Sequence, residues 1–159
     1  MVNVKLITVG SLKESYLREA EAEYVKRLGA FCRFENIQLK EAKMPDSPSK
    51  SEIEAVLLSE AKSILGAMSQ RSYKIAMCVE GKQLSSEGLS SMIEKASAEH
   101  GEICFVIGSS HGLHESVKSA CQMRLSVSEL TFPHQLMRVI LAEQIYRAYR
   151  IISGEPYHK

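Results

Sequence analysis

The segment Gly-Ser-Ser-His-Gly at residues 108–112 has the residue types that most directly suggest chemistry. Its two glycines let the backbone approach a ligand closely and adopt positive φ. The segment also fits the GxSxG pattern of α/β-hydrolases, with Ser110 as the nucleophile. An acid and then a histidine follow in the order that such a triad requires: Glu129 or Glu143, then His134 or His158. A small serine hydrolase is therefore one interpretation, although a pentapeptide is a weak signal and no separate oxyanion loop is evident.

Other common sites find little support in the sequence. The 108–112 segment is neither GxGxxG nor a P-loop, which would end in Lys-Ser/Thr, so no dinucleotide or nucleoside triphosphate site is predicted. Four cysteines form no CxxC pair, and His111 and His114 are the only close pair among five histidines. We expect reduced, packed thiols and no metal site.

Short apolar runs alternate with segments of helical period along most of the chain. Strands are predicted at residues 2–9, 31–39, 75–79, 103–107 and 124–128, and helices at residues 14–28, 51–68, 89–96 and 131–150. Gly29 is expected to close the first helix, and a capping box of Ser51 with Glu54 to open the second. The alternation predicts an α/β fold with a mainly parallel sheet and helices on both faces.

Ligands of parallel sheets bind outside the carboxyl ends of the strands. Three segments meet this condition: residues 80–82, 108–112 and 128–133.

The predicted last helix is apolar on nearly every side, whereas a helix with one wet face needs an apolar stripe only about 100° wide. Leu136, Val139 and Ile140 belong to one broad face, and Met137 and Leu141 lie well beyond it. A helix packed on the sheet with one face and on a second copy of the chain with the other would have this composition. We therefore expect a homodimer; the alternative is a central helix buried within one protomer.

Composition sets the remaining limits. The chain has 159 residues, 45% apolar and 25% charged, which fits one domain spanning residues 1–159. No apolar run is long enough to cross a membrane and the N-terminus lacks signal-peptide features, so we expect a cytoplasmic protein. A net charge of +1 does not suggest indiscriminate nucleic-acid binding.

Several motifs, in order along the whole chain, carry a resemblance to a known family. They are VGSLKESY, EGKQLSSEGL, VIGSSHGLHESV, SELTFPHQLMRVILAEQIYRAYRI and GEPYHK. Together they resemble the ribosomal RNA large subunit methyltransferase H family, within the SPOUT class of knotted methyltransferases. The resemblance implies S-adenosylmethionine as methyl donor and N3 of a pseudouridine in 23S ribosomal RNA as acceptor. It also implies a homodimer, an assembled ribosomal particle as target and a C-terminal trefoil knot.

The resemblance further implies which residues hold the donor: Met77, Gly108 and the loop Val127, Ser128, Glu129, Leu130, Thr131 and Phe132. Short loops at strand ends offer adenine an apolar slot with backbone donors and acceptors. One position departs from the family, which usually has a second glycine where this chain has Ser109. If that position required positive φ, serine would be strained there and donor affinity would fall.

Removing the N3 proton, or stabilising the anionic base that its loss leaves, calls for polar groups near the pocket. The candidates are His158 and Tyr157 in the tail, with Arg138 and Glu143 on the last helix. We expect the tail to contact the acceptor nucleotide, and Arg138 to bind RNA or stabilise developing charge. Plainer interpretations exist: a frayed end, an i,i+4 pair of Glu143 with Arg147, and Arg138 on a solvated face. A non-enzymatic ribosome-binding factor is a third functional class.

Overall fold

The computed structural model describes residues 1–156. Ten elements follow in the order β1 (Asn3–Val9), α1 (Ser15–Leu28), β2 (Arg33–Leu39), α2 (Lys50–Ala67), β3 (Tyr73–Gln83), α3 (Ser86–His100), β4 (Glu102–Ile107), α4 (Glu115–Ser119), β5 (Met123–Ser126) and α5 (His134–Ile152). The strands form one sheet in the order β2-β1-β4-β3-β5, and every pairing is parallel. The predicted α/β class is confirmed.

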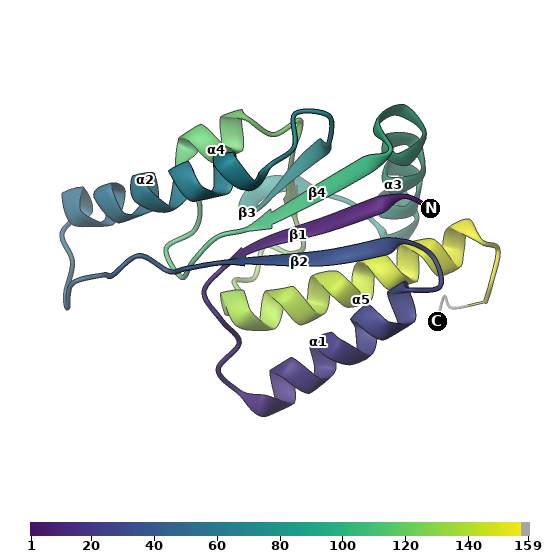
Figure 1. The fold of residues 1–159 in the computed structure, drawn as a ribbon, viewed down its shortest axis with the longest axis horizontal. Coiled ribbons are helices and arrows are strands. Elements are labelled where there is room, and N and C mark those ends of the chain that lie inside the picture. The colour runs from purple at the N-terminus through teal and green to yellow at the C-terminus, as the bar shows by residue number, and fades with distance from the viewer. Residues whose placement is uncertain (157–159) are drawn as a thin grey trace.

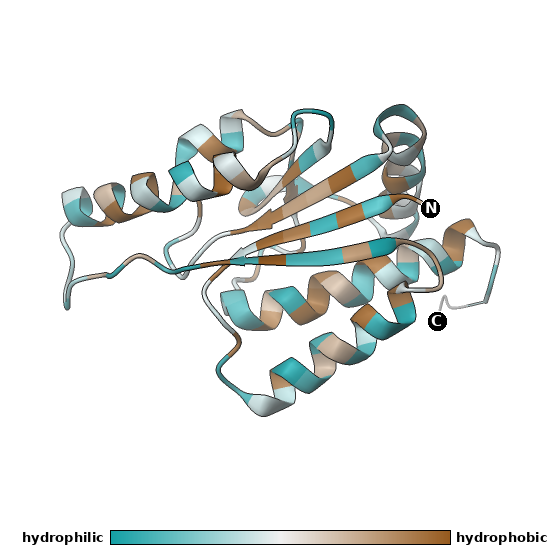
Figure 2. Cartoon of the chain, viewed as in Figure 1, coloured by the Kyte–Doolittle hydropathy of each residue, from teal (hydrophilic) through white to brown (hydrophobic). Residues whose placement is uncertain are grey.

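Helices cover both faces of the sheet, as Figure 1 shows: α1, α3 and α5 lie on one side and α2 and α4 on the other. Alternation along the strands supplies both cores, because successive side chains point to opposite faces. In β1, Val4 and Leu6 face α1 and α5, whereas Ile7 and Val9 face α2. The central strand β4 is hydrophobic along most of its length, and the edge strand β2 is more polar (Figure 2).

Helix α5 owes much of its apolar composition to packing within the protomer. It lies against the sheet and packs between α1 and α3. Leu141, Ile145 and Ala148 are buried in this core, and Tyr146 and Tyr149 pack against Phe31. One side remains partly exposed, with Leu136 37% exposed and Val139 and Ile140 half-buried. Most of the surface of α5 is therefore covered by its own protomer, as the alternative interpretation expected. The partly exposed side formed by Leu136, Val139 and Ile140, here called the outer strip, is what remains for a partner.

Several predicted boundaries are corrected. The capping box of α2 uses Ser49 and Glu52, two residues earlier than predicted, because the helix begins at Lys50. Gly29 follows α1 with an ordinary right-handed φ of −57°. The predicted third strand continues to Gln83 through an irregularity, and α4 is a short additional helix that was not predicted.

Candidate functional site

A cavity of about 730 Å³ opens at the carboxyl ends of β3, β4 and β5. This volume lies within the range of about 300–1,000 Å³ that is typical of small-molecule sites. Three segments build most of its wall: the irregular part of β3, the glycine loop at residues 108–112 that follows β4, and the loop at residues 127–133 that joins β5 to α5. Two of them match segments that the sequence places at the ligand-binding edge, and of the third predicted segment, residues 80–82, only Glu80 lines the cavity.

The glycine loop folds tightly back on itself. The amide of Gly112 donates to the carbonyl of Ser109 at 2.9 Å, and Gly112 has a φ of +86°. A Cβ atom on Gly108 would lie 2.2 Å from the Gly112 carbonyl oxygen, so only glycine fits at position 108 without a shift of the backbone. The tight turn thereby places residues 108–112 along the wall of the cavity.

Ser109 does not have a positive φ, because Ser47 is the only non-glycine residue with one in the described part of the chain. The strain expected at this position is therefore absent. Instead, the Ser109 hydroxyl donates to the Glu60 carboxylate of α2 at 2.8 Å.

The irregularity in β3 forms the second wall. Met77 pairs with Leu125 of β5, and Lys82 pairs with Leu125 again, so residues 78–81 bulge away from the ladder. A Cβ on Gly81 would approach the backbone of Arg124 and Leu125 to 2.7 Å, so glycine lets the strand return to β5. The bulge turns Cys78, Val79 and Glu80 towards the cavity.

The loop at residues 127–133 forms the third wall and leads into α5. The Ser126 hydroxyl donates to the Ser128 carbonyl at 2.9 Å, and the Leu130 amide donates to the Ser128 hydroxyl at 3.0 Å. These local bonds replace strand pairing after β5. Leu130, 71% exposed, lies at the cavity although its side chain is largely solvated.

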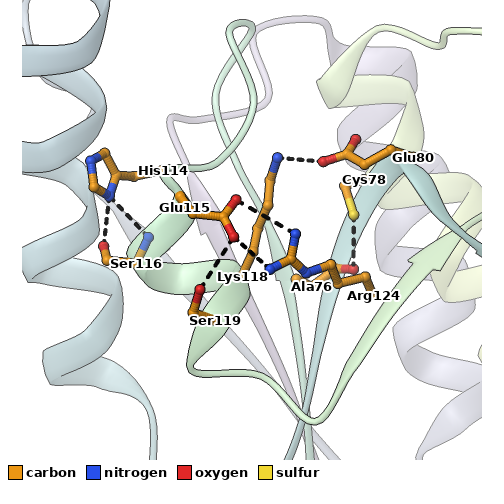
Figure 3. A network of polar contacts seen from close by, with 9 residues as sticks. All are labelled: Ala76, Cys78, Glu80, His114, Glu115, Ser116, Lys118, Ser119 and Arg124. Atoms are coloured by element: carbon orange, nitrogen blue, oxygen red, sulfur yellow. Dashed lines mark hydrogen bonds and ion pairs between the residues drawn. The ribbon is translucent and has the colours of Figure 1, made fainter.

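Ion pairs tie α4 to the neighbouring strands β3 and β5, as Figure 3 shows. Lys118 of α4 donates to Glu80 on the bulge, and Arg124 of β5 donates to Glu115 of α4 at 2.6 Å. The hydrogen bond from Lys118 holds the pKa of Glu80 below its ordinary value, and that from Arg124 does the same for Glu115. Burial raises the pKa of the neighbouring Cys78 thiol, which keeps it protonated.

The structure brings together seven of the eight residues expected to hold a donor: Met77, Gly108, Val127, Ser128, Leu130, Thr131 and Phe132 all line this one cavity. Glu129 is not among the lining residues. Whether these residues contact a donor stays a prediction.

The four candidates for acceptor chemistry do not form one cluster among residues 1–156. Tyr157 and His158 lie outside the described residues. Arg138 is 4% exposed and does not line the cavity; its guanidinium donates to both carboxylate oxygens of Glu21 at 2.8 and 3.0 Å. The solvated-face interpretation of Arg138 is thus corrected. Glu143 accepts from Arg147 at 2.8 Å, the i,i+4 pair considered as its plainer interpretation.

Ser110 lacks the surroundings of a hydrolase nucleophile. It is exposed in the turn between Ser109 and Gly112, and α4 begins only at Glu115. Across residues 1–156, no hydrogen bond joins its hydroxyl to an imidazole.

Metal and thiol chemistry also lack a visible centre. Within the described part of the chain, no three potential ligands are grouped to hold a metal ion. Burial raises the pKa of the Cys32 and Cys104 thiols to about 12, so both are unreactive. No described helix is long and apolar enough to cross a membrane.

Sequence reasoning missed part of the lining, namely Cys78, Val79, Ile107, Leu113, Lys118 and Met137. Most are apolar residues that a pattern assigns to an ordinary core. The available signal was positional, since Cys78 and Val79 precede Glu80-Gly81-Lys82, which the sequence did mark as a strand end.

Comparisons with known proteins give matches that cover nearly the whole chain. A family model described as predicted SPOUT methyltransferase matches residues 2–158. "Ribosomal RNA large subunit methyltransferase H" of Streptococcus thermophilus (strain ATCC BAA-491 / LMD-9) is 50% identical over 99% of this chain and 100% of its own. The proteins with this name in Clostridioides difficile (strain 630) and Bacillus pumilus (strain SAFR-032) are 46% and 44% identical with the same coverage.

Two solved structures share the fold at low identity. A probable methyltransferase from Bordetella pertussis Tohama I superposes with a TM-score of 0.60 at 12% identity, covering 92% of this chain and 93% of that one. A tRNA (m1G37) methyltransferase from Aquifex aeolicus superposes with a TM-score of 0.56 at 11% identity, covering 99% and 75%.

Proposed function

Because this chain belongs to the SPOUT methyltransferase family, we propose that it transfers a methyl group from S-adenosylmethionine to N3 of a pseudouridine in 23S ribosomal RNA, acting in the cytoplasm on the assembled ribosome. The observation that carries the proposal is the match to proteins named ribosomal RNA large subunit methyltransferase H, at 44–50% identity over 99% of the chain. Identity this high over the full length supports a common reaction rather than a common fold alone.

The cavity described above supports S-adenosylmethionine as the donor. Its walls combine apolar residues such as Met77 and Leu125 with the glycine loop and the 127–133 loop, a lining suited to an adenine ring. Gly108 keeps the loop closed on itself while leaving its surface free of a Cβ. When bound, S-adenosylmethionine supplies a methyl group already activated by the sulfonium. The protein therefore has mainly to align the acceptor and manage one proton.

We propose that the tail removes the N3 proton and contacts the acceptor nucleotide. His158 or Tyr157 would be the contacting group. A residue near neutral pKa, such as histidine, suits removal of a weakly acidic proton. Arg138 is engaged with Glu21, so we propose that it holds α5 in place rather than touching RNA. Glu143 remains a candidate for orienting Arg147, its ion-pair partner.

The surface suits a shaped target better than free RNA. With a net charge of +1, the chain offers little general attraction to phosphate. We expect weak, salt-dependent binding to naked RNA and recognition of a folded ribosomal particle. A homodimer formed through the outer strip of α5 would place a second chain beside the 127–133 loop.

Calorimetry with S-adenosylmethionine, followed by a methyl-transfer assay on ribosomal particles, tests the proposal. Binding and incorporation of one methyl group at pseudouridine N3 are expected. Binding to particles without donor binding or transfer would instead indicate a non-enzymatic ribosome-binding factor. Labelling of Ser110 by a fluorophosphonate would revive the hydrolase interpretation.

Deleting residues 157–159 tests the role assigned to the tail. We expect methyl transfer to fall to background while donor affinity changes by less than about threefold, because the deleted residues follow α5 and the cavity is lined by residues 77–137. The full-length chain assayed in parallel is the reference, with mass spectrometry of the modified RNA as readout. Full turnover by the truncated protein would refute the assignment.

A further inference from the structure

The feature that the proposed reaction does not use is a buried carboxylate on α2. Glu60 is 4% exposed. One of its oxygens accepts from the Ser109 hydroxyl at 2.8 Å and the other from the Ala42 amide at 3.2 Å. Across residues 1–156, no lysine, arginine or histidine forms an ion pair with it. Because a buried carboxylate is costly without hydrogen bonds, these two donors are what make Glu60 tolerable in this place.

The Ser109 end of this contact lies inside the candidate site. Ser109 is itself buried, lines the cavity and follows Gly108 in the glycine loop. Its carbonyl accepts from the Gly112 amide, so its backbone fixes the turn while its side chain reaches back to α2. A displacement of Ser109 would therefore move the loop residues that line the cavity.

Helix α2 holds the same segment at a second point. Glu54, six residues before Glu60, contacts the His114 ring at 2.7 Å, where α4 is about to begin. The two carboxylates of one helix thus hold residues 109 and 114, the two ends of the segment that includes the cavity loop. Glu54 is 66% exposed, so its contact should contribute less than that of Glu60.

We propose that Glu60 is a positioning residue for donor binding, which acts by holding the glycine loop through the Ser109 hydroxyl. This inference takes its ligand from the proposed function. The contact that holds the loop is independent of that function. The inference assigns a role in the site to α2, a helix that contributes no residue to the cavity lining.

The test compares wild-type protein with Ser109→Ala, Glu60→Gln, Glu60→Ala and the double variant Ser109→Ala/Glu60→Ala. Matched controls are Ser63→Ala on the exposed face of α2 and Glu94→Gln on the exposed face of α3. Calorimetry measures affinity for S-adenosylmethionine, and steady-state assays separate KM for the donor from kcat. Hydrogen exchange of residues 110–113 is measured on the free protein, and thermal unfolding on every variant.

We expect Ser109→Ala to weaken donor binding about tenfold, the loss typical of one hydrogen bond to a buried charged group. KM should rise with kcat at saturating donor within about twofold, since the alignment of the bound donor is unchanged. Glu60→Gln keeps an oxygen acceptor and should fall between wild type and Glu60→Ala. The double variant should bind the donor no more weakly than Glu60→Ala, because the two substitutions remove the same contact. Amides 110–113 should exchange faster in each variant that lacks the contact.

Unchanged exchange and unchanged donor affinity in Ser109→Ala would overturn the inference. A fall in kcat together with a fall in thermal stability, without a rise in KM, would also overturn the inference, because it would indicate a general structural role. If wild-type protein bound no donor, the proposed function would fail, and the exchange measurements would still decide whether Glu60 holds the loop.

Discussion

At the scale of single residues, the candidate site depends on a glycine that leaves room for the backbone and on a serine whose side chain forms a buried hydrogen bond. Gly108 is needed because the loop passes so close to itself that a Cβ would meet the Gly112 carbonyl at 2.2 Å. Ser109, its neighbour, is accommodated because its hydroxyl has a buried partner. Two adjacent small residues therefore have different physical reasons for their identity.

Replacing Gly108 by alanine should open the loop. Because the clashing atom is backbone, relief requires a shift of the turn, and we expect a loss of about 1–3 kcal/mol of stability with at least tenfold weaker donor binding. Gly66→Ala is the matched control, since a Cβ there meets nothing within 4 Å near the end of α2. It should stabilise the protein by about 0.5–1 kcal/mol. Urea unfolding and calorimetry with S-adenosylmethionine provide both readouts, and Gly108→Ala with wild-type affinity would contradict this account of the loop.

Local patterns could predict Gly108 but not the state of Ser109. A glycine after a buried strand is a visible signal for a tight turn. The partner of Ser109, however, is 49 positions away on another helix, and no spacing along the chain indicates that contact. The same limit applies to Arg138, whose type suggested a surface role although Glu21, 117 positions away, pairs with it in the interior.

At the scale of elements, the start of α2 shows why helix boundaries are the least certain part of a sequence-based prediction. The run Ser-Lys-Ser-Glu-Ile-Glu contains two overlapping capping boxes, Ser49 with Glu52 and Ser51 with Glu54. The chain uses the first. Tertiary context separates them, since Glu54 is engaged by His114 of the segment leading into α4.

Alanine at each serine should reveal which box operates. Ser49→Ala removes the acceptor for the Glu52 amide and should cost about 1 kcal/mol of stability. Ser51→Ala, two residues away and inside the helix, is the matched control and should change stability little, since alanine favours helix. Chemical denaturation of both variants measures the difference. A larger loss for Ser51→Ala would mean that the helix begins later than residue 50.

The contact between α1 and α5 includes the buried pair of Glu21 and Arg138. Glu21→Gln would leave the Arg138 guanidinium buried without its counter-charge, and we expect a loss of about 3–5 kcal/mol. Glu21→Gln/Arg138→Met should lose less than the sum of the single changes. Glu23→Gln, which breaks an exposed pair on the same helix, should have no measurable effect. Small losses in thermal unfolding for all these variants would contradict a structural role for Arg138 and favour an RNA contact.

At the scale of the whole molecule, hydrophobic periodicity was enough to predict a parallel sheet with helices on both faces, because each strand places alternate residues in two cores. It also gave the edge of the sheet where the cavity lies. The bulge in β3 could not be predicted, since it depends on how Gly81 passes the backbone of β5. The path by which α5 returns beneath the sheet is likewise set by packing between α1 and α3.

The outer strip of α5 connects the fold to its expected assembly. Leu136 is exposed and Ile140 half-buried on the side of α5 that α1, α3 and the sheet leave uncovered. Leu136 lies in the first turn of α5, directly after the 127–133 loop, so a second chain packed there would also lie close to the candidate cavity. We expect the protein to be a dimer at micromolar concentration and Ile140→Lys to be a monomer, because a charge in an apolar interface is not compensated.

Light scattering coupled to size exclusion measures this change, with circular dichroism to show that the variant is folded. Leu58→Lys, on the exposed face of α2 and 43% exposed in the wild type, is the matched control and should remain dimeric. If the partner completes the cavity, Ile140→Lys should also lose methyl transfer, whereas Leu58→Lys should not. A monomeric wild type, or a dimer that survives Ile140→Lys, would mean that the apolar character of α5 serves the protomer alone.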